Sequence, residues 1–315
     1  MYVSSSLSIG ALRYGIPGRI PDRSYVFPAD AAEKERLALQ HNLLKRVLDN
    51  RLIMADVAIG PQDQILDSGT GSGAYSRPVG AAFECSLMRY PMSGIWLLDV
   101  MKVVPGSTVL HGVDIESALF PLDDPTIVSR GNVHFHVGSC AALPSDWDGR
   151  FKLVNQRHMI GALRREEWEG SFREIFRVLE PGGWVQLGEV GYWKAGPETD
   201  KFNALSRTAA TARGLVLDCA ALIPDMLRQA GFTQISVEPT LIPLGSNGGE
   251  LAADARKNWM GAFRGVKTPV LKAGGFGHVG SEADFDLMMD KMENEWQTSP
   301  NAELQNNVIC ARKPA

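Results

Sequence analysis

The segment Gln64-Ile-Leu-Asp-Ser-Gly-Thr-Gly-Ser-Gly73 decides the fold of this chain. An apolar pair, Ile65-Leu66, leads directly into Asp67 and then into three glycines spaced two residues apart. Glycine permits backbone conformations and close ligand approaches that a side chain would block. The pattern is typical of the turn that follows the first strand of a ligand-binding α/β sheet. A glycine loop alone is also compatible with an ordinary turn, so its neighbours decide between the two interpretations.

The 21 residues from Ala74 to Gly94 separate this turn from the helix that it should open. Pro78 and Gly80 are poor residues for the first two turns of a helix. The next good helical pattern is Ile95-Trp-Leu-Leu-Asp-Val-Met-Lys-Val-Val104, and joining it to Gly73 restores an uninterrupted strand, turn and helix. We therefore interpret residues 74–94 as an insertion. It is either a translated intron, because 21 codons preserve the reading frame, or a genuine surface loop or substrate lid.

The position of Asp114 supports the same interpretation. Asp114 ends the apolar run Thr108-Val-Leu-His-Gly-Val-Asp114, which predicts the second strand. In nucleotide-binding folds, an acid at this place follows the glycines by about 20 residues and holds a pair of ribose hydroxyls. Asp114 lies 45 positions after Gly69, and 24 positions after it once the 21 residues are removed. The glycine turn and Asp114 together favour a nucleotide-type ligand over an ordinary turn.

Composition limits the function classes that fit. The chain has 315 residues, 44% of them hydrophobic and 22% charged, as expected of a globular protein. We expect a flexible N-terminal arm over residues 1–24 and a single domain over residues 25–315. A net charge of −4 provides no basic field for a polyanion, so we expect a small-molecule partner and no nucleic acid. The four cysteines are scattered without metal-ligand spacing, so neither a metal site nor a disulfide framework is expected.

The N-terminus and the hydropathy pattern indicate location. Residues 3–16 lack the basic segment of a signal peptide, although the absence of acidic residues before Asp22 leaves a transit peptide open. No apolar run approaches the roughly 20 residues that span a bilayer. We therefore expect a cytoplasmic protein without a membrane partner, and the oligomeric state stays open.

Strand and helix patterns alternate along the rest of the chain. Capping signals, helical periodicity and short β-rich runs predict the elements. The predicted helices cover residues 30–50, 95–103, 166–179, 198–213, 219–230, 249–264 and 281–297, and the further strands cover 132–136, 151–154, 184–189, 234–244 and 307–311. This alternation predicts a mainly parallel α/β sheet covered on both faces, with ligands at the carboxyl ends of its strands.

With these motifs in place, the chain resembles the class I S-adenosylmethionine-dependent methyltransferases, and within them the fungal LaeA-like group associated with secondary metabolism. The resemblance extends from Tyr25 to Pro314. The motifs that carry it are Tyr25-Val-Phe-Pro-Ala-Asp30, Glu35-Arg-Leu37, Gln40-His41, Leu66-Asp-Ser-Gly-Thr-Gly-Ser-Gly73, His111-Gly-Val-Asp-Ile115, Asn155-Gln-Arg157, Arg177-Val-Leu-Glu-Pro-Gly-Gly-Trp184 and Leu187-Gly-Glu189. It implies a Rossmann-like, seven-stranded sheet of order 3-2-1-4-5-7-6 with an antiparallel last strand, helices on both faces and an N-terminal helical arm.

The resemblance also implies an enzyme that uses S-adenosyl-L-methionine, with Asp114 accepting hydrogen bonds from both ribose hydroxyls. The implied cofactor-binding residues are Asp67, Gly69, Gly71, Gly73, Asp114, Ile115, Ser139, Cys140, Gln156 and Arg157. Asp67 either orients the glycine loop or meets the cofactor amine, and it also fits a simple turn residue. Arg157 either holds the cofactor carboxylate or pairs with Glu189. The family often has an acid where this chain has Gly138-Ser-Cys-Ala141, so the adenine contact would fall to Ser139 or to the backbone.

Methyl transfer from a sulfonium is an in-line displacement by a positioned nucleophile, so a strong catalytic signature is not expected. His158 follows the fourth strand and either serves as a general base or packs as a partly buried histidine. Tyr25, Met159, Tyr192 and Trp193 are the predicted substrate residues, with an aromatic core role as the alternative for the last two. His41, His134, His136 and His278 lack ligand spacing and are interpreted as structural.

The leading hypothesis is therefore a methyltransferase that acts on an oxygen, nitrogen or sulfur nucleophile of a small secondary metabolite. The first alternative is a LaeA-like regulatory protein of secondary metabolism that works through protein partners. The second is a catalytically impaired product, because residues 74–94 interrupt the cofactor motif.

Overall fold

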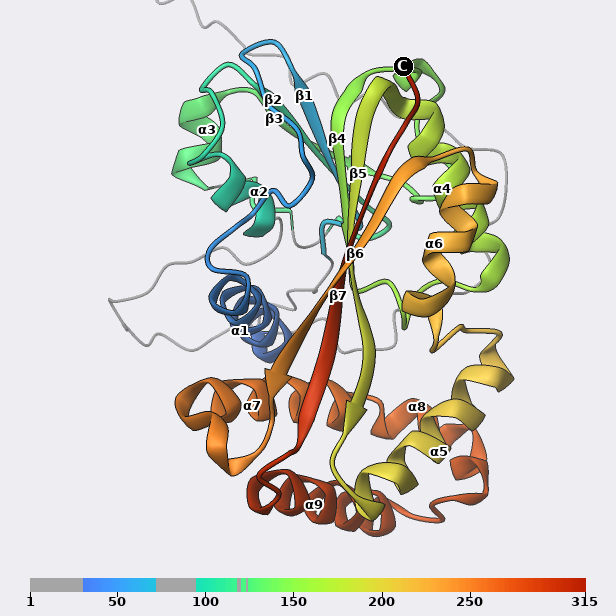
Figure 1. Cartoon of the computed structure of the whole chain (residues 1–315). Helices are drawn as coiled ribbons and strands as arrows, with labels where there is room; N and C mark the ends of the chain where they lie inside the picture. Colours follow the sequence, from blue (N-terminus) through green and yellow to red (C-terminus); the bar gives the residue numbers. More distant parts are fainter. Residues whose placement is uncertain (1–30, 72–94, 118–119, 123) are drawn as a thin grey trace, which may run out of the picture.

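One sheet organises the chain. The computed structural model describes residues 31–71, 95–117, 120–122 and 124–315. Within them, seven strands form a sheet of order β3-β2-β1-β4-β5-β7-β6 (Figure 1). The strands are β1 (Gln64–Ser68), β2 (Val109–Asp114), β3 (Val133–Val137), β4 (Phe151–Arg157), β5 (Leu179–Lys194), β6 (Thr233–Pro243) and β7 (Glu303–Arg312). β7 runs antiparallel to both neighbours and the other pairs are parallel, which confirms the predicted topology.

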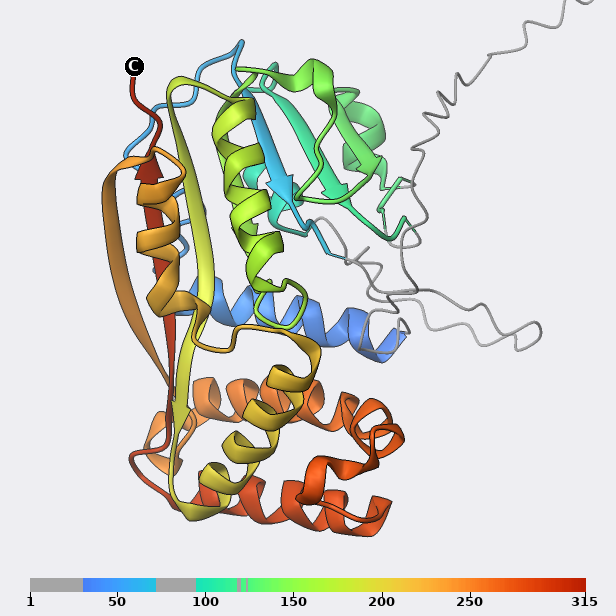
Figure 2. The same ribbon diagram turned by 90° about the vertical axis from the view of Figure 1, so that its right-hand side faces the viewer.

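Helices cover both faces of this sheet. In chain order they are α1 (Ala31–Val47), α2 (Ile95–Val100), α3 (Pro125–Arg130), α4 (Arg165–Val178), α5 (Pro197–Arg213), α6 (Cys219–Gln229), α7 (Gly249–Gly265), α8 (Lys267–Lys272) and α9 (Glu282–Thr298). α4 and α6 lie together on one face (Figure 2). α2 packs on the opposite face. The first strand shows why both layers form: Leu66 joins the cluster under α4, whereas its neighbour Ile65 joins the cluster under α2.

Three strands continue beyond the rest of the sheet and support a second group of helices. β5 runs to Lys194, well past the predicted end at residue 189, and pairs along its whole extension with β7. α5, α7, α8 and α9 gather around this extension (Figure 1). A separate apolar cluster fills the space between them, with Phe202, Trp259 and Trp296 among its buried members. We call this group of helices, with the extensions of β5, β6 and β7, the lower layer.

α1 connects the sheet to the lower layer. It crosses between the carboxyl ends of the central strands and α7, as Figure 2 shows. Leu43 and Leu44 are buried in the cluster of the lower layer, while the other side of the helix meets α2. Because α1 packs against both parts, it lies beside the carboxyl ends of the strands, where ligands bind in α/β sheets.

Candidate functional site

The glycine turn after β1 is held by its own aspartate and by the neighbouring strand. Gly69 and Gly71 have φ values of 73° and 112°, in the region that favours glycine. The Gly69 and Thr70 amides donate to the Val113 carbonyl at 2.8 and 3.0 Å. The buried Asp67 carboxylate accepts hydrogen bonds from the Thr70 hydroxyl at 2.7 Å and from the Asn155 amide at 2.6 Å. Asp67 therefore orients the loop, one of its predicted roles. Gly73 lies outside the described residues.

Asp114 lies at the end of β2, directly beside the glycine turn. The residue is 8% exposed, and its carboxylate accepts hydrogen bonds from the backbone amides of Gly71 at 3.0 Å and Glu116 at 3.2 Å. Burial raises the pKa of Asp114, while these amide donors oppose the shift. The structure thus brings together the two motifs that the sequence places 45 positions apart. Ile115, the next residue, is 56% exposed.

The loop after β3 lies beside the same strand end, because the Gly138 amide donates to the Asp114 carbonyl at 2.9 Å. Ser139 turns inward on its own loop, where its hydroxyl accepts a hydrogen bond from the Ala141 amide at 3.2 Å. Cys140 is buried, and burial raises the pKa of its thiol to about 11. The thiol is therefore protonated at neutral pH and has no nucleophilic character.

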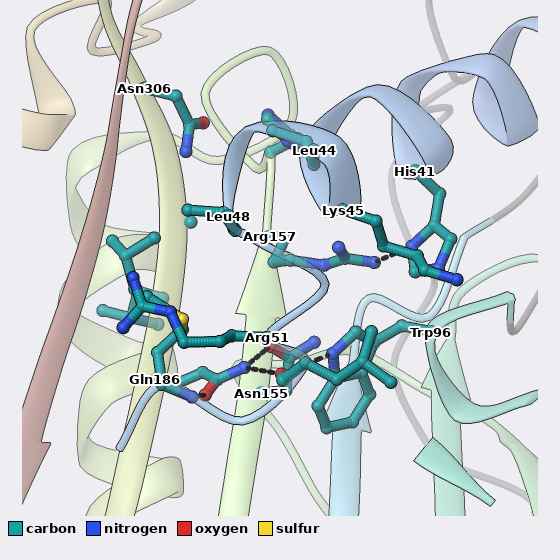
Figure 3. A pocket seen from close by; sticks show the side chains of 16 residues that line it. His41, Leu44, Lys45, Leu48, Arg51, Trp96, Asn155, Arg157, Gln186 and Asn306 are labelled. Atoms are coloured by element: carbon teal, nitrogen blue, oxygen red, sulfur yellow. Dashed lines mark hydrogen bonds between the residues drawn. The ribbon is translucent and has the colours of Figure 1, made fainter. Parts of the chain in front are cut away.

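The two adjacent candidates at the end of β4 lie on opposite faces of the sheet, as strand alternation requires. Gln156 points toward α4, where its oxygen accepts hydrogen bonds from the hydroxyls of Ser68 at 3.2 Å and Ser171 at 2.9 Å. Its amide nitrogen is buried without a partner. Arg157 points the other way, toward α1, with its Nη2 3.5 Å from His41 Nδ1 (Figure 3).

Arg157 does not pair with Glu189, which was one of its two predicted roles. The Glu189 carboxylate instead accepts hydrogen bonds from the backbone amides of Met159 at 2.6 Å and Ile160 at 3.3 Å. Burial raises the pKa of Glu189 to about 8. Burial also lowers the pKa of Arg157, while the charge of Asp67 opposes that shift. Glu189 therefore holds the loop after β4, and the charge that acts on the Arg157 pKa is that of Asp67.

His158 and Met159 occupy the junction between the strand ends and the lower layer. His158 has φ of 55°, which strains a residue with a side chain, and its ring lies 6.0 Å from that of Trp259 in α7. Both ring nitrogens are buried without a hydrogen-bond partner, and burial lowers the pKa of His158 to about 3. Met159 packs on the glycine turn, since a Cβ added to Gly69 would lie 2.8 Å from its sulfur.

The predicted aromatic pair on β5 is divided between the two faces of the strand. Trp193 points into the lower layer, where its ring lies 5.1 Å from that of Phe263 and its indole nitrogen is buried without a partner. Tyr192 is 39% exposed, and its hydroxyl donates to Glu303 at 3.0 Å on the outer face. The prediction that both line one pocket is wrong for Tyr192, because successive residues of a strand face opposite ways. Tyr25 lies outside the described residues.

Two residues that the sequence did not assign to the site, His41 and Asp99, reach it from the helices. His41 Nε2 lies 3.0 Å from the Asp99 carboxylate, and both residues are buried. The sequence carried one usable signal, which is that Asp99 is a single acid within the apolar stretch Ile95–Val100. An acid among apolar residues requires a buried partner, but the sequence does not identify that partner as a histidine of another helix.

A cavity of about 30 Å³ lies between α1 and the adjoining face of β4, β5 and β7 (Figure 3). His41, Asn155, Arg157 and Gln186 are among its lining residues. A space of this size holds about one or two water molecules, far less than a nucleoside. The glycine turn and Asp114 do not line it, whereas Arg157 does, so the cavity adjoins only the Arg157 end of the predicted cofactor position.

Within residues 31–71, 95–117, 120–122 and 124–315, no group of three or more His, Cys, Asp and Glu side chains is arranged to hold a metal ion. In the same part of the chain, none of the helices combines the length and the apolar character needed to cross a bilayer.

Comparison with known proteins finds similarity to methyltransferases. A family described as a methyltransferase domain matches residues 92–183. The N-methyltransferase verN of Clonostachys rogersoniana is 27% identical over 297 residues, covering 93% of each chain. The N-methyltransferase sirN of Leptosphaeria maculans is 29% identical over 258 residues, which cover 78% of this chain and 81% of that one. Among solved structures, a geranyl diphosphate methyltransferase in complex with S-adenosylmethionine has 13% identity and a TM-score of 0.48, covering 91% of this chain and 92% of that one.

The motif order, the sheet topology and the full-length similarity to named methyltransferases lead to one assignment. The chain belongs to the class I S-adenosylmethionine-dependent methyltransferases and is an enzyme that uses S-adenosylmethionine as its cofactor.

Proposed function

We propose that this enzyme transfers the methyl group of S-adenosylmethionine to a nitrogen atom of a small secondary metabolite. The observation that carries the proposal is the set of fungal relatives named N-methyltransferases, two of which match more than nine tenths of this chain. Their names favour nitrogen among the three acceptor atoms that the sequence leaves open. The acidic net charge of −4 supports a small molecule over a nucleic acid.

The donor set at the strand ends fits the chemical groups of the cofactor. When bound, S-adenosylmethionine supplies an already activated methyl group, so the protein has to bind, align and exclude water. In our proposal the Asp114 carboxylate accepts hydrogen bonds from the ribose hydroxyls. The Arg157 guanidinium holds the cofactor carboxylate, and Asp67 faces the ammonium. Each assignment places an acceptor opposite a donor, or a charge opposite its counter-charge.

The adenine position follows from the residues beside Asp114. Ile115 presents an apolar side chain that is 56% exposed at the end of β2, and a flat base is a suitable partner for it. Ser139 and Cys140 follow β3 at the adjoining strand end. The Ser139 hydroxyl keeps donor capacity, because in its bond with Ala141 it acts as the acceptor. We assign the adenine to the space between these two loops.

We place the nucleophile on the side of His158, where the strand ends meet α7. His158 is neutral at physiological pH because burial lowers its pKa to about 3, so one of its ring nitrogens has a free lone pair. That lone pair can accept a hydrogen bond from the N–H of a nitrogen nucleophile and orient it, and the low pKa makes the ring a weak base for the proton itself. Trp259 and Trp193 both have buried indole N–H groups without a partner, and an otherwise apolar substrate with carbonyl acceptors would satisfy them. Packing against Trp259 is the competing role for His158.

We also propose that residues 74–94 are an insertion into the original cofactor fold. The supporting observation is that the match to the methyltransferase family begins at residue 92 and leaves out β1 and the glycine turn. A chain that carries a foreign segment at this point would lose continuity with the family there. Residues 74–94 themselves lie outside the described residues.

A labelling experiment tests the proposed reaction. The purified full chain is incubated with S-adenosylmethionine carrying a deuterated methyl group and with a small-molecule extract of a fungal culture. We expect products that gain one labelled methyl group, placed on nitrogen by NMR. The matched control is Asp114→Ala, which should give none. Labelled products methylated only on oxygen or sulfur would refute the nitrogen assignment. A chain that binds S-adenosylmethionine but labels no product would favour the regulatory alternative.

A further inference from the structure

A chain of buried polar contacts runs from α2 through α1 to the end of β4. Asp99 of α2 and His41 of α1 are 8% and 3% exposed, and the Asp99 Oδ2 to His41 Nε2 distance is 3.0 Å. The other ring nitrogen of His41, Nδ1, lies 3.5 Å from Nη2 of Arg157 (Figure 3). The Asp99 carboxylate of α2 is thus linked through His41 of α1 to the guanidinium of Arg157 at the end of β4.

The chemistry of these groups fixes the proton on His41. Asp99 is ionised, since the hydrogen bond from His41 holds its pKa well below the usual range, and Lys45 and Lys102 also contact it. A carboxylate only accepts, so Nε2 of His41 must donate to Asp99. An arginine only donates, so Nδ1 must present its lone pair to Arg157. Only the neutral imidazole satisfies both contacts, and burial lowers the pKa of His41 to about 4, which keeps it neutral.

The stem of Arg157 is confined from the other side. Gly188 of β5 lies against it, and a Cβ added at that position would be 3.2 Å from Cγ and 3.4 Å from Cδ of Arg157. The charge of Asp67 acts on the same guanidinium. A long side chain ordinarily loses much rotamer freedom when it binds a ligand. Here β5 and His41 restrict the Arg157 side chain before any ligand binds.

We propose that Asp99 and His41 are positioning residues that hold Arg157 ready for the carboxylate of the cofactor. The inference rests on the proposed function, in which Arg157 receives that carboxylate. It adds that α1 and α2 take part in cofactor binding without touching the cofactor, because the Asp99–His41 pair sets the direction of the guanidinium.

Two ligands that share the nucleoside half separate this role from a structural one. S-adenosylhomocysteine carries the carboxylate, whereas methylthioadenosine lacks both the carboxylate and the amine. Calorimetry on the full chain measures both for wild type, Arg157→Met, His41→Ala and the double variant. We expect His41→Ala to weaken S-adenosylhomocysteine about tenfold, as for one hydrogen bond to a charged group, and to leave methylthioadenosine unchanged. In the Arg157→Met background, His41→Ala should have no further effect.

Two more variants distinguish a specific loss of binding from unfolding of the protein. His41→Gln keeps one donor and one acceptor, so we expect its affinity for S-adenosylhomocysteine to stay within about threefold of wild type. Lys102→Met removes an exposed partner of Asp99 and leaves His41 in place, so it is the matched control and should bind normally. Equal losses for both ligands, or additive losses in the double variant, would overturn the inference. Wild type that binds methylthioadenosine but not S-adenosylhomocysteine would also overturn it. Binding of neither ligand would refute the cofactor site itself, and with it the proposed function.

Discussion

Replacing Asp114 with alanine is the most direct perturbation of the cofactor site. In the structure Asp114 is 8% exposed, and its carboxylate is already oriented by the amides of Gly71 and Glu116. Each hydrogen bond from a ribose hydroxyl to such a charged acceptor contributes about 1.5–3 kcal/mol. Two of them contribute about 3–6 kcal/mol, or roughly 10²- to 10⁴-fold in affinity. Release of the Gly71 amide would also loosen the glycine turn and add to the loss.

Isothermal calorimetry with S-adenosylhomocysteine measures this loss, and thermal unfolding shows that the variant is folded. Asp114→Asn is the control for volume, because it keeps the size of the side chain but places an amide nitrogen where a second acceptor is needed. We expect binding to become undetectable in the alanine variant and to weaken strongly in the asparagine variant. An affinity of Asp114→Ala within about threefold of wild type, in a folded protein, would refute the assignment of the ribose to Asp114.

Three further predictions concern the residues around this site. His158→Ala should lower turnover by about 10² while cofactor affinity is unchanged, and unchanged turnover would leave His158 as a packing residue against Trp259. Burial raises the folded-state pKa of Glu189 to about 8, so its stabilising contribution is complete below the unfolded value of 4.5 and is lost as the pH rises through 8. Urea unfolding between pH 5 and 8 should therefore show wild type losing stability relative to Glu189→Gln, by up to about 1.4 kcal/mol per pH unit, and parallel curves would contradict this. Deleting residues 74–94 should strengthen cofactor binding, and sequencing the transcript tests whether the segment is an intron. A transcript that keeps the segment, together with a deletion variant that loses activity, would show that the segment is a functional loop.

The sequence alone predicted the α/β fold class and most of its elements from local signals. The apolar pair Ile65-Leu66 before Asp67, and the apolar run that ends at Asp114, predicted the first two strands. The seven-strand order came from the resemblance to a family, and the structure confirms it. Helical periodicity over residues 166–179 predicted α4, in which Trp168, Phe172 and Ile175 are buried. Such signals can be recognised because apolar residues recur along the chain with the period of a helix or a strand.

The side-chain arrangement at the site was readable only in part. Strand alternation already implies that Tyr192 and Trp193 face opposite ways, yet which of them faces the lower layer depends on the pairing of β5 with β7. The length of β5 was also underestimated, because the predicted strand stopped at residue 189. The strand continues to Lys194 through its pairing with the distant residues 303–306.

The tertiary structure alone decided the partners of Arg157. The sequence motif left it between the cofactor carboxylate and Glu189, but the folded chain gives Glu189 to the amides of Met159 and Ile160. It places His41 and Asp99, 116 and 58 positions away from Arg157 in sequence, beside the guanidinium or one contact from it. Residue types and spacing specify what a side chain can bond to. Which bonds form depends on how α1 and α2 pack against the sheet, and that packing is set by apolar contacts across the whole molecule.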